Sequence, residues 1–224
     1  MTSGGEYMIY KKYLKRVVDI LCSGLTLIVL APIFLIVALA IKLDTRGPAI
    51  FTQKRIGKDK EPFKIYKFRT MLTFEDSYYE DGTPIENYDR ITKVGNFLRK
   101  TSLDELPQLI NIFIGDMSIV GPRPTLSYQV EKYNSHQARR LEVKPGLTGL
   151  AQVSGRNSLS WDEKIQCDID YVSRITFIRD LKIILKTVLI VLKTEKVEFT
   201  RPDEISKHNG DVLKDVGDTT RSKN

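Results

Sequence analysis

The longest apolar run of the chain extends from Val17 to Ile41, and its only charged residue is Asp19. About 20 apolar residues are enough for a helix to cross the hydrocarbon core of a bilayer. The run is also longer than the ~7–15-residue apolar region of a secretory signal peptide. We therefore predict a membrane helix, because a helix buried in a soluble core explains this length poorly.

Two features of this segment favour a re-entrant helix over a spanning one. Pro32 lies near the middle, where its missing backbone N–H favours a bend. Basic residues also occupy both flanks: Lys11, Lys12, Lys15 and Arg16 precede the run, and Lys42, Arg46, Lys54 and Arg55 follow it. Since basic flanks prefer the cytoplasmic side, a helix that dips into one leaflet and returns suits both of them. A spanning helix remains the alternative.

Downstream, the pattern changes to short strands and amphipathic helices. Residues 49–71 form two β-prone runs around the turn GKDKEP, which predicts a basic hairpin. The polar segment 73–90 has weak periodicity and is interpreted as a surface loop. Helices are predicted at residues 94–99, 103–114, 126–141, 159–172 and 181–192. The last of them aligns lysines at 182, 186 and 193 along an apolar helix, which suits either a membrane interface or the protein core.

Together these elements predict an α+β, helix-rich fold. It combines an N-terminal re-entrant membrane helix with a small β-hairpin and interfacial amphipathic helices. We divide the chain into an N-terminal membrane segment at 1–46, a membrane-associated domain at 47–200 and a polar tail at 201–224. The tail lacks core-forming residues, which is typical of a flexible segment.

Charge and cysteine content narrow the class of partner. The chain has 35 Lys and Arg against 28 Asp and Glu, a net charge of +7. This excess indicates an anionic partner such as nucleic acid, a membrane surface or a phosphorylated substrate.

The two cysteines, Cys22 and Cys167, lie far apart and have neither metal-ligand nor redox spacing. They are therefore typical of small buried residues in a reducing compartment.

The stretch TSLDELPQL places two acids, Asp104 and Glu105, directly before an apolar run. One explanation is a capping box, in which Ser102 caps a helix and Glu105 bonds back to the cap amide. The other is catalysis, because the dipole at a helix N-terminus would keep Asp104 ionised and able to attack phosphorus. The pair alone favours capping.

The neighbouring motifs favour catalysis. In GDMSIVGPRP, Arg123 lies between two prolines, an arrangement that would hold its guanidinium ready for phosphate oxygens. The stretch KPGLTGLAQVSGRN contributes three glycines between Lys144 and Arg156, whose amides and cations suit a diphosphate. Arg99 adds a cation five residues before Asp104.

In this order, the membrane segment, FKIYKFRTM, SLDELPQL, GDMSIVGPRP and KPGLTGLAQVSGRN resemble the monotopic bacterial polyprenyl-phosphate phosphoglycosyl transferases over residues 12–200. The resemblance implies that Asp104 is the nucleophile with Glu105 as its partner, and that Arg99 and Arg123 bind phosphate. It also implies a requirement for Mg²⁺ and matches Asp168 to an active-site acid, so Asp104 and Asp168 are the expected metal ligands. The family breaks its re-entrant helix at a Ser-Pro pair, whereas this chain has Ala31-Pro32.

The implied reaction moves a sugar-1-phosphate from a UDP-sugar donor to a polyprenyl (undecaprenyl) phosphate acceptor. It proceeds through a covalent phosphosugar on Asp104 and releases UMP. The expected location is the bacterial inner membrane, with a catalytic domain at 47–200 on the cytoplasmic face. Membrane lipids are expected partners and nucleic acid is not, while the sugar, the glycan pathway and the oligomeric state stay open.

Two alternative functions also remain open. Asp168 and Asp170 form a D-x-D, as in metal-dependent glycosyl transferases, although residues two apart do not share a helix face. Alternatively, the basic and aromatic residues of 54–69 suit a membrane-tethered nucleic-acid-binding protein.

Overall fold

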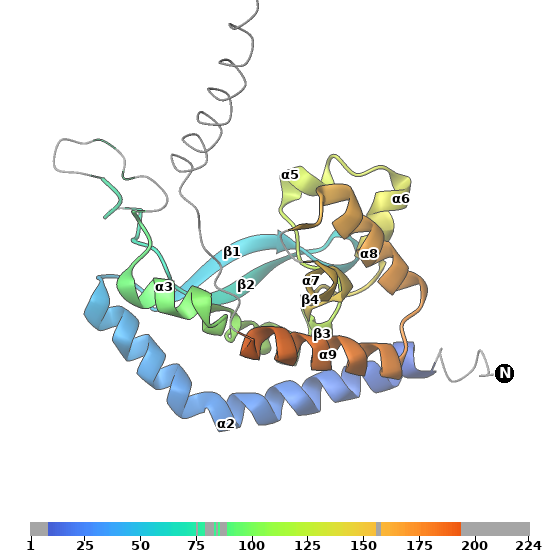
Figure 1. Cartoon of the computed structure of the whole chain (residues 1–224), viewed down its shortest axis with the longest axis horizontal. Coiled ribbons are helices and arrows are strands. Elements are labelled where there is room, and N and C mark those ends of the chain that lie inside the picture. The colour runs from blue at the N-terminus through green and yellow to red at the C-terminus, as the bar shows by residue number, and fades with distance from the viewer. Residues whose placement is uncertain are drawn as a thin grey trace, which may run out of the picture.

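A long N-terminal helix runs along one side of the molecule, and the other elements pack against it (Figure 1). The structure is a computed structural model that describes residues 9–74, 76–78, 83, 85, 89–155 and 158–193. The polar tail at 201–224 and parts of the segment 73–90 lie outside the described residues. The helix-rich α+β fold is confirmed, with two small two-stranded sheets among the described residues.

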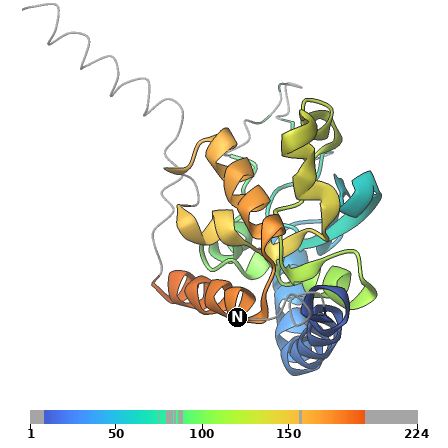
Figure 2. The same cartoon turned by 90° about the vertical axis from the view of Figure 1, so that its right-hand side faces the viewer.

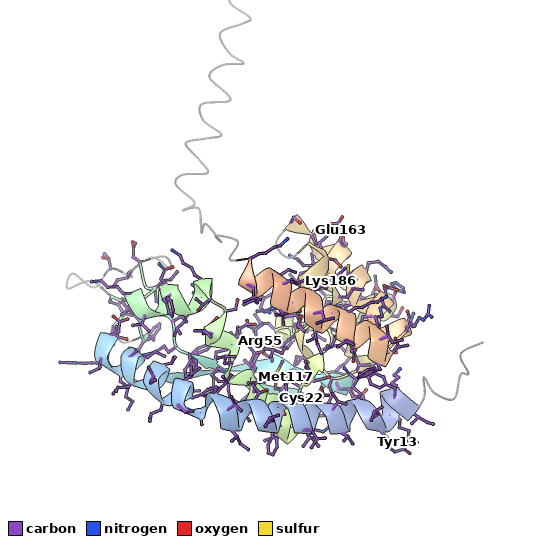
Figure 3. All side chains as sticks on the ribbon, turned by 60° about the horizontal axis from the view of Figure 1, so that its bottom comes forward. Tyr13, Cys22, Arg55, Met117, Glu163 and Lys186 are labelled. Carbon is purple, nitrogen blue, oxygen red and sulfur yellow. The ribbon has the colours of Figure 1, made fainter. Side chains whose placement is uncertain are left out.

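The N-terminal helix α2, Lys15–Asp44, follows one π-helical turn, η1, Tyr10–Leu14. Pro32 lies inside α2 without ending it, and the helix is visibly curved (Figure 1). Within the described residues, this is the helix that is long and apolar enough to cross a membrane, by length and composition. Many of its apolar side chains project away from the protein (Figure 3), and Ile28 and Leu35 are exposed by 75% and 72%. The helix is therefore not a core helix of the domain.

The predicted hairpin is present. Strand β1, Ile50–Ile56, pairs antiparallel with β2, Pro62–Phe68, around the short 3-10 turn η2, Lys58–Lys60. Phe68 and the buried end of α2 form one part of the core. The hairpin thus packs directly on the membrane-type helix.

A buried asparagine joins the hairpin to the helix α4, Gln108–Ile114. The amide of Asn111 donates from Nδ2 to the Lys64 carbonyl (2.7 Å), and its Oδ1 accepts from the Tyr66 amide (3.0 Å). The Asn111 side chain is completely buried. It therefore acts as a short strand partner for the open edge of β2.

The second sheet depends on close backbone contacts. Strand β3, Ser118–Val120, runs parallel to β4, Gly146–Thr148. A Cβ atom added at Gly146 would lie 2.1 Å from the Gly121 nitrogen, and one added at Gly149 would lie 2.2 Å from the Gly121 carbonyl oxygen. Glycine is therefore required where these segments meet.

Three predicted helices are confirmed with shifted ends. They are α3, Lys93–Lys100, α8, Trp161–Ser173, and α9, Phe177–Leu192. Helix α9 begins earlier than predicted because the Thr176 hydroxyl caps it, accepting from the Arg179 amide at 3.3 Å.

Two continuous helices predicted from the sequence are wrong. Residues 103–114 divide into the 3-10 turn η3, Leu103–Glu105, and α4, with Pro107 between them. Residues 126–141 divide into α5, Ser127–Val130, α6, Ser135–Ala138, and most of the 3-10 turn η4, Arg139–Glu142. Asn134 starts α6 by capping it, because its Oδ1 accepts from the Gln137 amide. The short helix α7, Leu150–Ser154, follows β4.

Helix α9 has both a docked face and an open apolar face. Asp180 and Ile183 are buried, whereas Ile178, Leu185 and Leu192 are exposed by 65%, 55% and 72%. Figures 1 and 2 both place α9 on the same side of the molecule as α2. The two helices therefore give this side a largely apolar surface.

Asn111→Ala should lower the free energy of unfolding by about 2–4 kcal/mol, since it leaves two partly buried backbone groups of β2 unpaired at about 1–3 kcal/mol each. Chemical denaturation in detergent would measure the change. The control is Asn96→Ala on the exposed face of α3, which should change stability by less than about 0.5 kcal/mol. Equal stability of the two variants would contradict the role of Asn111.

Candidate active site

The two acids lie in the 3-10 turn η3, one turn ahead of α4. The capping-box interpretation is wrong, because Ser102 has a left-handed backbone (φ 57°) and its side chain accepts no cap hydrogen bond. The carboxylate of Glu105 turns instead toward the hairpin and toward the loop after β3. Neither acid therefore caps a helix.

Glu105 is held by two cations. Its Oε1 lies 2.6 Å from Lys67 Nζ and 2.6 Å from Arg123 Nη2. Burial alone would raise the pKa of Glu105, but Arg123 and Lys67 outweigh it and lower the pKa to about 2. Glu105 is thus ionised at every physiological pH, which suits an anchor for cations better than a proton carrier.

Asp104 differs from its neighbour. It is half-buried, and no ion pair or hydrogen bond to its carboxylate is found among the described residues. Burial, and then the charge of Glu105, raise the pKa of Asp104, while Lys67, Arg99 and Arg123 act in the opposite direction. An unpaired carboxylate with a raised pKa is a better nucleophile than one held in an ion pair.

Arg123 stands where the sequence suggested, exposed between two prolines and forked onto Glu105. Its backbone is fixed as well, since Arg140 Nη2 donates to the Arg123 carbonyl at 3.0 Å. Arg99, in the last turn of α3, contributes to the field at Asp104. Arg55, labelled in Figure 3, is a further cation near the site: burial, and then the charge of the neighbouring Arg123, lower its pKa. The cations near the two acids outnumber them, so the site has a net positive charge that would attract a phosphate.

Asp168 lies behind this site. It is 2% exposed, and its Oδ2 pairs with Arg140 Nη2 at 2.5 Å. Burial raises the pKa of Asp168 to about 6, although Arg140 opposes the shift. Because Arg140 also holds the Arg123 carbonyl, Asp168 reaches the site through a positioned arginine.

The expected metal ligands are not equally suited to the task. Among the described residues, no group of three or more His, Cys, Asp or Glu side chains could hold a metal. Mg²⁺, however, is commonly bound by one or two carboxylates together with substrate phosphates. The unpaired carboxylate of Asp104 fits that pattern, whereas Asp168 already has a cationic partner.

The stretch KPGLTGLAQVSGRN does not form the expected glycine cradle. Gly146 and Gly149 are buried against Gly121, and the Gly146 amide donates to the Pro122 carbonyl at 2.8 Å. Lys144 lines a separate cavity that includes none of the acid pair. Arg156 lies outside the described residues.

The D-x-D alternative loses its support. Asp168 is buried on Arg140, whereas the Asp170 side chain is 58% exposed and pairs with Arg179. Two carboxylates with different partners and different exposure do not form one metal site.

Sequence reasoning missed Lys67 and Arg140. A signal for Lys67 exists, because it continues the side of β2 that carries Phe63 and the buried Ile65. A lysine on the inward side of a strand indicates a buried anion partner. No comparable pattern marks Arg140, which is buried at the end of a segment predicted to be one helix.

Comparison with known proteins gives a family. The model of the family described as bacterial sugar transferase matches residues 10–194. The chain is 43% identical over 187 residues to the uncharacterized sugar transferase EpsL of Bacillus subtilis, covering 84% of this chain and 91% of that protein. It is 43% identical over 189 residues to a UDP-glucose:undecaprenyl-phosphate glucose-1-phosphate transferase of Caulobacter vibrioides, covering 81% of this chain and 70% of that one.

A third relative is longer than this chain. The undecaprenyl-phosphate galactose phosphotransferase of Salmonella typhimurium is 40% identical over 198 residues, which cover 82% of this chain and 41% of that protein. The match therefore concerns one part of the longer relative.

Replacing Asp168 should change how stability depends on pH. Its folded-state pKa of about 6 is above the ordinary 3.8, so its contribution is fully present below the ordinary value and is lost as pH rises through 6. Relative to Asp168→Asn, the wild type should lose about 2 kcal/mol of unfolding free energy between pH 4 and pH 7. Denaturation curves across that range would measure it, and parallel pH profiles would contradict the burial effect.

Proposed function

Since the chain belongs to the bacterial sugar transferase family, we propose that it transfers a sugar-1-phosphate from a UDP-sugar to undecaprenyl phosphate. The names of the Caulobacter and Salmonella relatives support this pair of substrates. One observation carries the mechanism: within the described part of the chain, Asp104 has no ion pair or hydrogen bond to its carboxylate, while the adjacent Glu105 holds two cations. This is the arrangement needed for a carboxylate that attacks a phosphorus atom.

In the first step, an Asp104 carboxylate oxygen attacks the sugar-linked phosphorus of the UDP-sugar. The new O–P bond forms as the diphosphate bridge breaks, and UMP leaves with the bridging oxygen. The product is a phosphosugar on Asp104. The raised pKa of Asp104 favours this step, because a more basic carboxylate is a stronger nucleophile toward phosphorus.

In the second step, a phosphate oxygen of the lipid acceptor attacks the same phosphorus. The bond to Asp104 breaks, and the carboxylate is restored as polyprenyl-diphospho-sugar forms. Neither step needs a proton on Glu105, which matches its pKa of about 2. Glu105 keeps Arg123 and Lys67 in position in both steps.

The cations offset the charge that develops on phosphate oxygens. Arg123 is best placed for this, since half of its side chain is exposed while its backbone is fixed. Mg²⁺, where bound, would be held by Asp104 together with substrate phosphates and would neutralise charge on the diphosphate. Asp168 would act by holding Arg140, which keeps Arg123 in place.

The exposed apolar surface of the protein supports monotopic insertion into one leaflet of the membrane. The open faces of α2 and α9 form the apolar side of the molecule (Figures 1 and 2). The curve of α2 and its basic flanks suit a re-entrant helix with both ends on the cytoplasmic side of the inner membrane. A lipid phosphate and a soluble nucleotide could then reach the same aspartate.

Asp104→Asn should lower turnover at least about 10³-fold, because the nucleophile is lost while the shape is kept. With UDP-sugar and no lipid acceptor, mass spectrometry should find one phosphosugar on the wild-type peptide that contains Asp104. That adduct should disappear when undecaprenyl phosphate is added, and UMP should be the nucleotide released.

The matched control is Glu131→Gln, which removes an exposed acid between α5 and α6 and should keep full activity. Turnover by Asp104→Asn near the wild-type rate, an adduct on another residue, or UDP as the sole nucleotide product would each refute the mechanism.

A cysteine introduced near residue 5, in a Cys22→Ser/Cys167→Ser background, should resist a membrane-impermeant thiol reagent added to intact cells. A re-entrant helix leaves that position in the cytoplasm, where the reagent reaches it only after the membrane is opened. A cysteine at Lys132 serves as the control for the catalytic domain. Labelling near residue 5 from outside, with none at 132, would show a spanning helix.

A further inference from the structure

A cavity separate from the acid pair lies between the N-terminal end of α2, the strand β3 and residues 142–144. Its volume is about 580 Å³. Basic side chains dominate its lining: Lys11, Lys12, Lys15, Arg16, Lys58 and Lys144. The acids of the lining are Asp19 and Glu142. Six cations against two acids leave the cavity positively charged.

Both acids of the lining are occupied. Asp19 is buried, and its Oδ1 accepts from the Ile119 amide at 2.9 Å. Glu142 pairs at 3.5 Å with Arg139, which does not line the cavity. Neither carboxylate is therefore dedicated to the cations of the cavity.

Lys58 pairs with its neighbour Asp59 at 3.2 Å, and two further cations are committed to the fold. Lys15 pairs with Asp180 at 2.5 Å, and Arg16 donates to the Ile112 and Phe113 carbonyls at 2.6 and 2.8 Å. Lys144 is different, since no hydrogen bond or ion pair to its Nζ is found among the described residues. Burial, and then the charge of Arg16, lower the pKa of Lys144. An anion bound beside Lys144 would stabilise its charged form and so oppose this shift.

A neutral donor completes the cavity. Ser118 is among the lining residues and is 2% exposed, and its hydroxyl has no hydrogen-bond partner among the residues that the structure describes. Burying an unpaired hydroxyl is unfavourable, so a native structure normally gives it a partner. An oxygen-rich anion held by Lys144 could accept from Ser118.

The cavity borders the apolar surface. Tyr13, Leu14 and Leu21 on the adjoining turns are exposed by 60%, 47% and 64%. An anion that reaches Lys144 from this side would come from the headgroup layer of a membrane in which α2 is inserted.

We propose that this cavity binds the phosphoryl group of an anionic phospholipid headgroup, with Lys144 and Ser118 as its contacts. The site is distinct from the acid pair, because Arg16 and Lys144 lie at the C-terminal end of α4 and Asp104 precedes its N-terminal end. Seven helical residues separate the two by about 10 Å. The assignment rests on the proposed membrane placement of α2 and is independent of the reaction at Asp104.

Native mass spectrometry of the full chain in an uncharged detergent tests the site. The wild type should retain one phosphatidylglycerol in preference to phosphatidylcholine at equal concentration. Lys144→Gln should weaken phosphatidylglycerol binding about fivefold, the effect of one lysine at an anionic lipid surface. The control is Lys132→Gln, an exposed lysine between α5 and α6, which should bind as the wild type does.

Ser118→Ala separates ligand binding from folding. Without lipid, loss of an unpaired buried hydroxyl should leave the unfolding midpoint unchanged or raised. With phosphatidylglycerol, the variant should bind more weakly than the wild type. Unchanged binding by both Lys144→Gln and Ser118→Ala, or equal retention of the two lipids, would overturn the proposal.

Inorganic phosphate distinguishes the source of the anion. Failure of millimolar phosphate to displace phosphatidylglycerol supports a lipid headgroup. Displacement that is lost in Lys144→Gln would overturn the lipid assignment in favour of a soluble phosphate. None of these readouts requires turnover, so they stand apart from the test of Asp104.

Discussion

The two ion pairs of Glu105 are the interaction on which the site depends. They join β2, the η3 turn and the loop after β3, which are far apart along the chain. Glu105 and Lys67 are each only 20% exposed, so their attraction is screened less than that of a surface pair. Glu105 takes both cations, and among the described residues no ion pair or hydrogen bond holds the carboxylate of Asp104. One acid thus organises the charge, and on the proposed function the other attacks the substrate.

This arrangement requires a rigid frame, since a shift of 1 Å would separate the charges from a reacting phosphate. Asn111 fixes α4 to the edge of the hairpin that carries Lys67. Arg140 fixes the backbone of Arg123 and is itself held by the buried Asp168. Gly121 begins the loop that carries Arg123, and its close backbone contacts with Gly146 and Gly149 fix the position of that loop relative to β4. Residues without a chemical role therefore determine where the reactive ones lie.

Local signals in the sequence predicted much of this fold. The membrane-type helix and the hairpin follow from hydrophobic runs and turn residues, and Arg123 follows from its two prolines. The failures have a common cause in long-range contacts. The glycines of KPGLTG were predicted to form a phosphate-binding loop. In the structure they pack against Gly121, some 25 positions earlier, which the local sequence does not indicate. No local pattern indicates either that Asp168, an expected metal ligand by resemblance, has Arg140 as its ion-pair partner.

The position of α4 determines how far Asp104 lies from the residues at the other end of that helix. Arg16 of α2 holds the C-terminal carbonyls of α4, and Ile114 at that end is 57% exposed. The other end of α4 follows Asp104, about 10 Å away. On the proposed function, a lipid tail could stay against the apolar side while its phosphate reaches Asp104. A carboxylate placed deeper would be harder to ionise, and one placed farther out would be beyond the lipid. On the proposed function, the short helix α4 would therefore set the depth at which an ionised nucleophile and a membrane-bound acceptor meet.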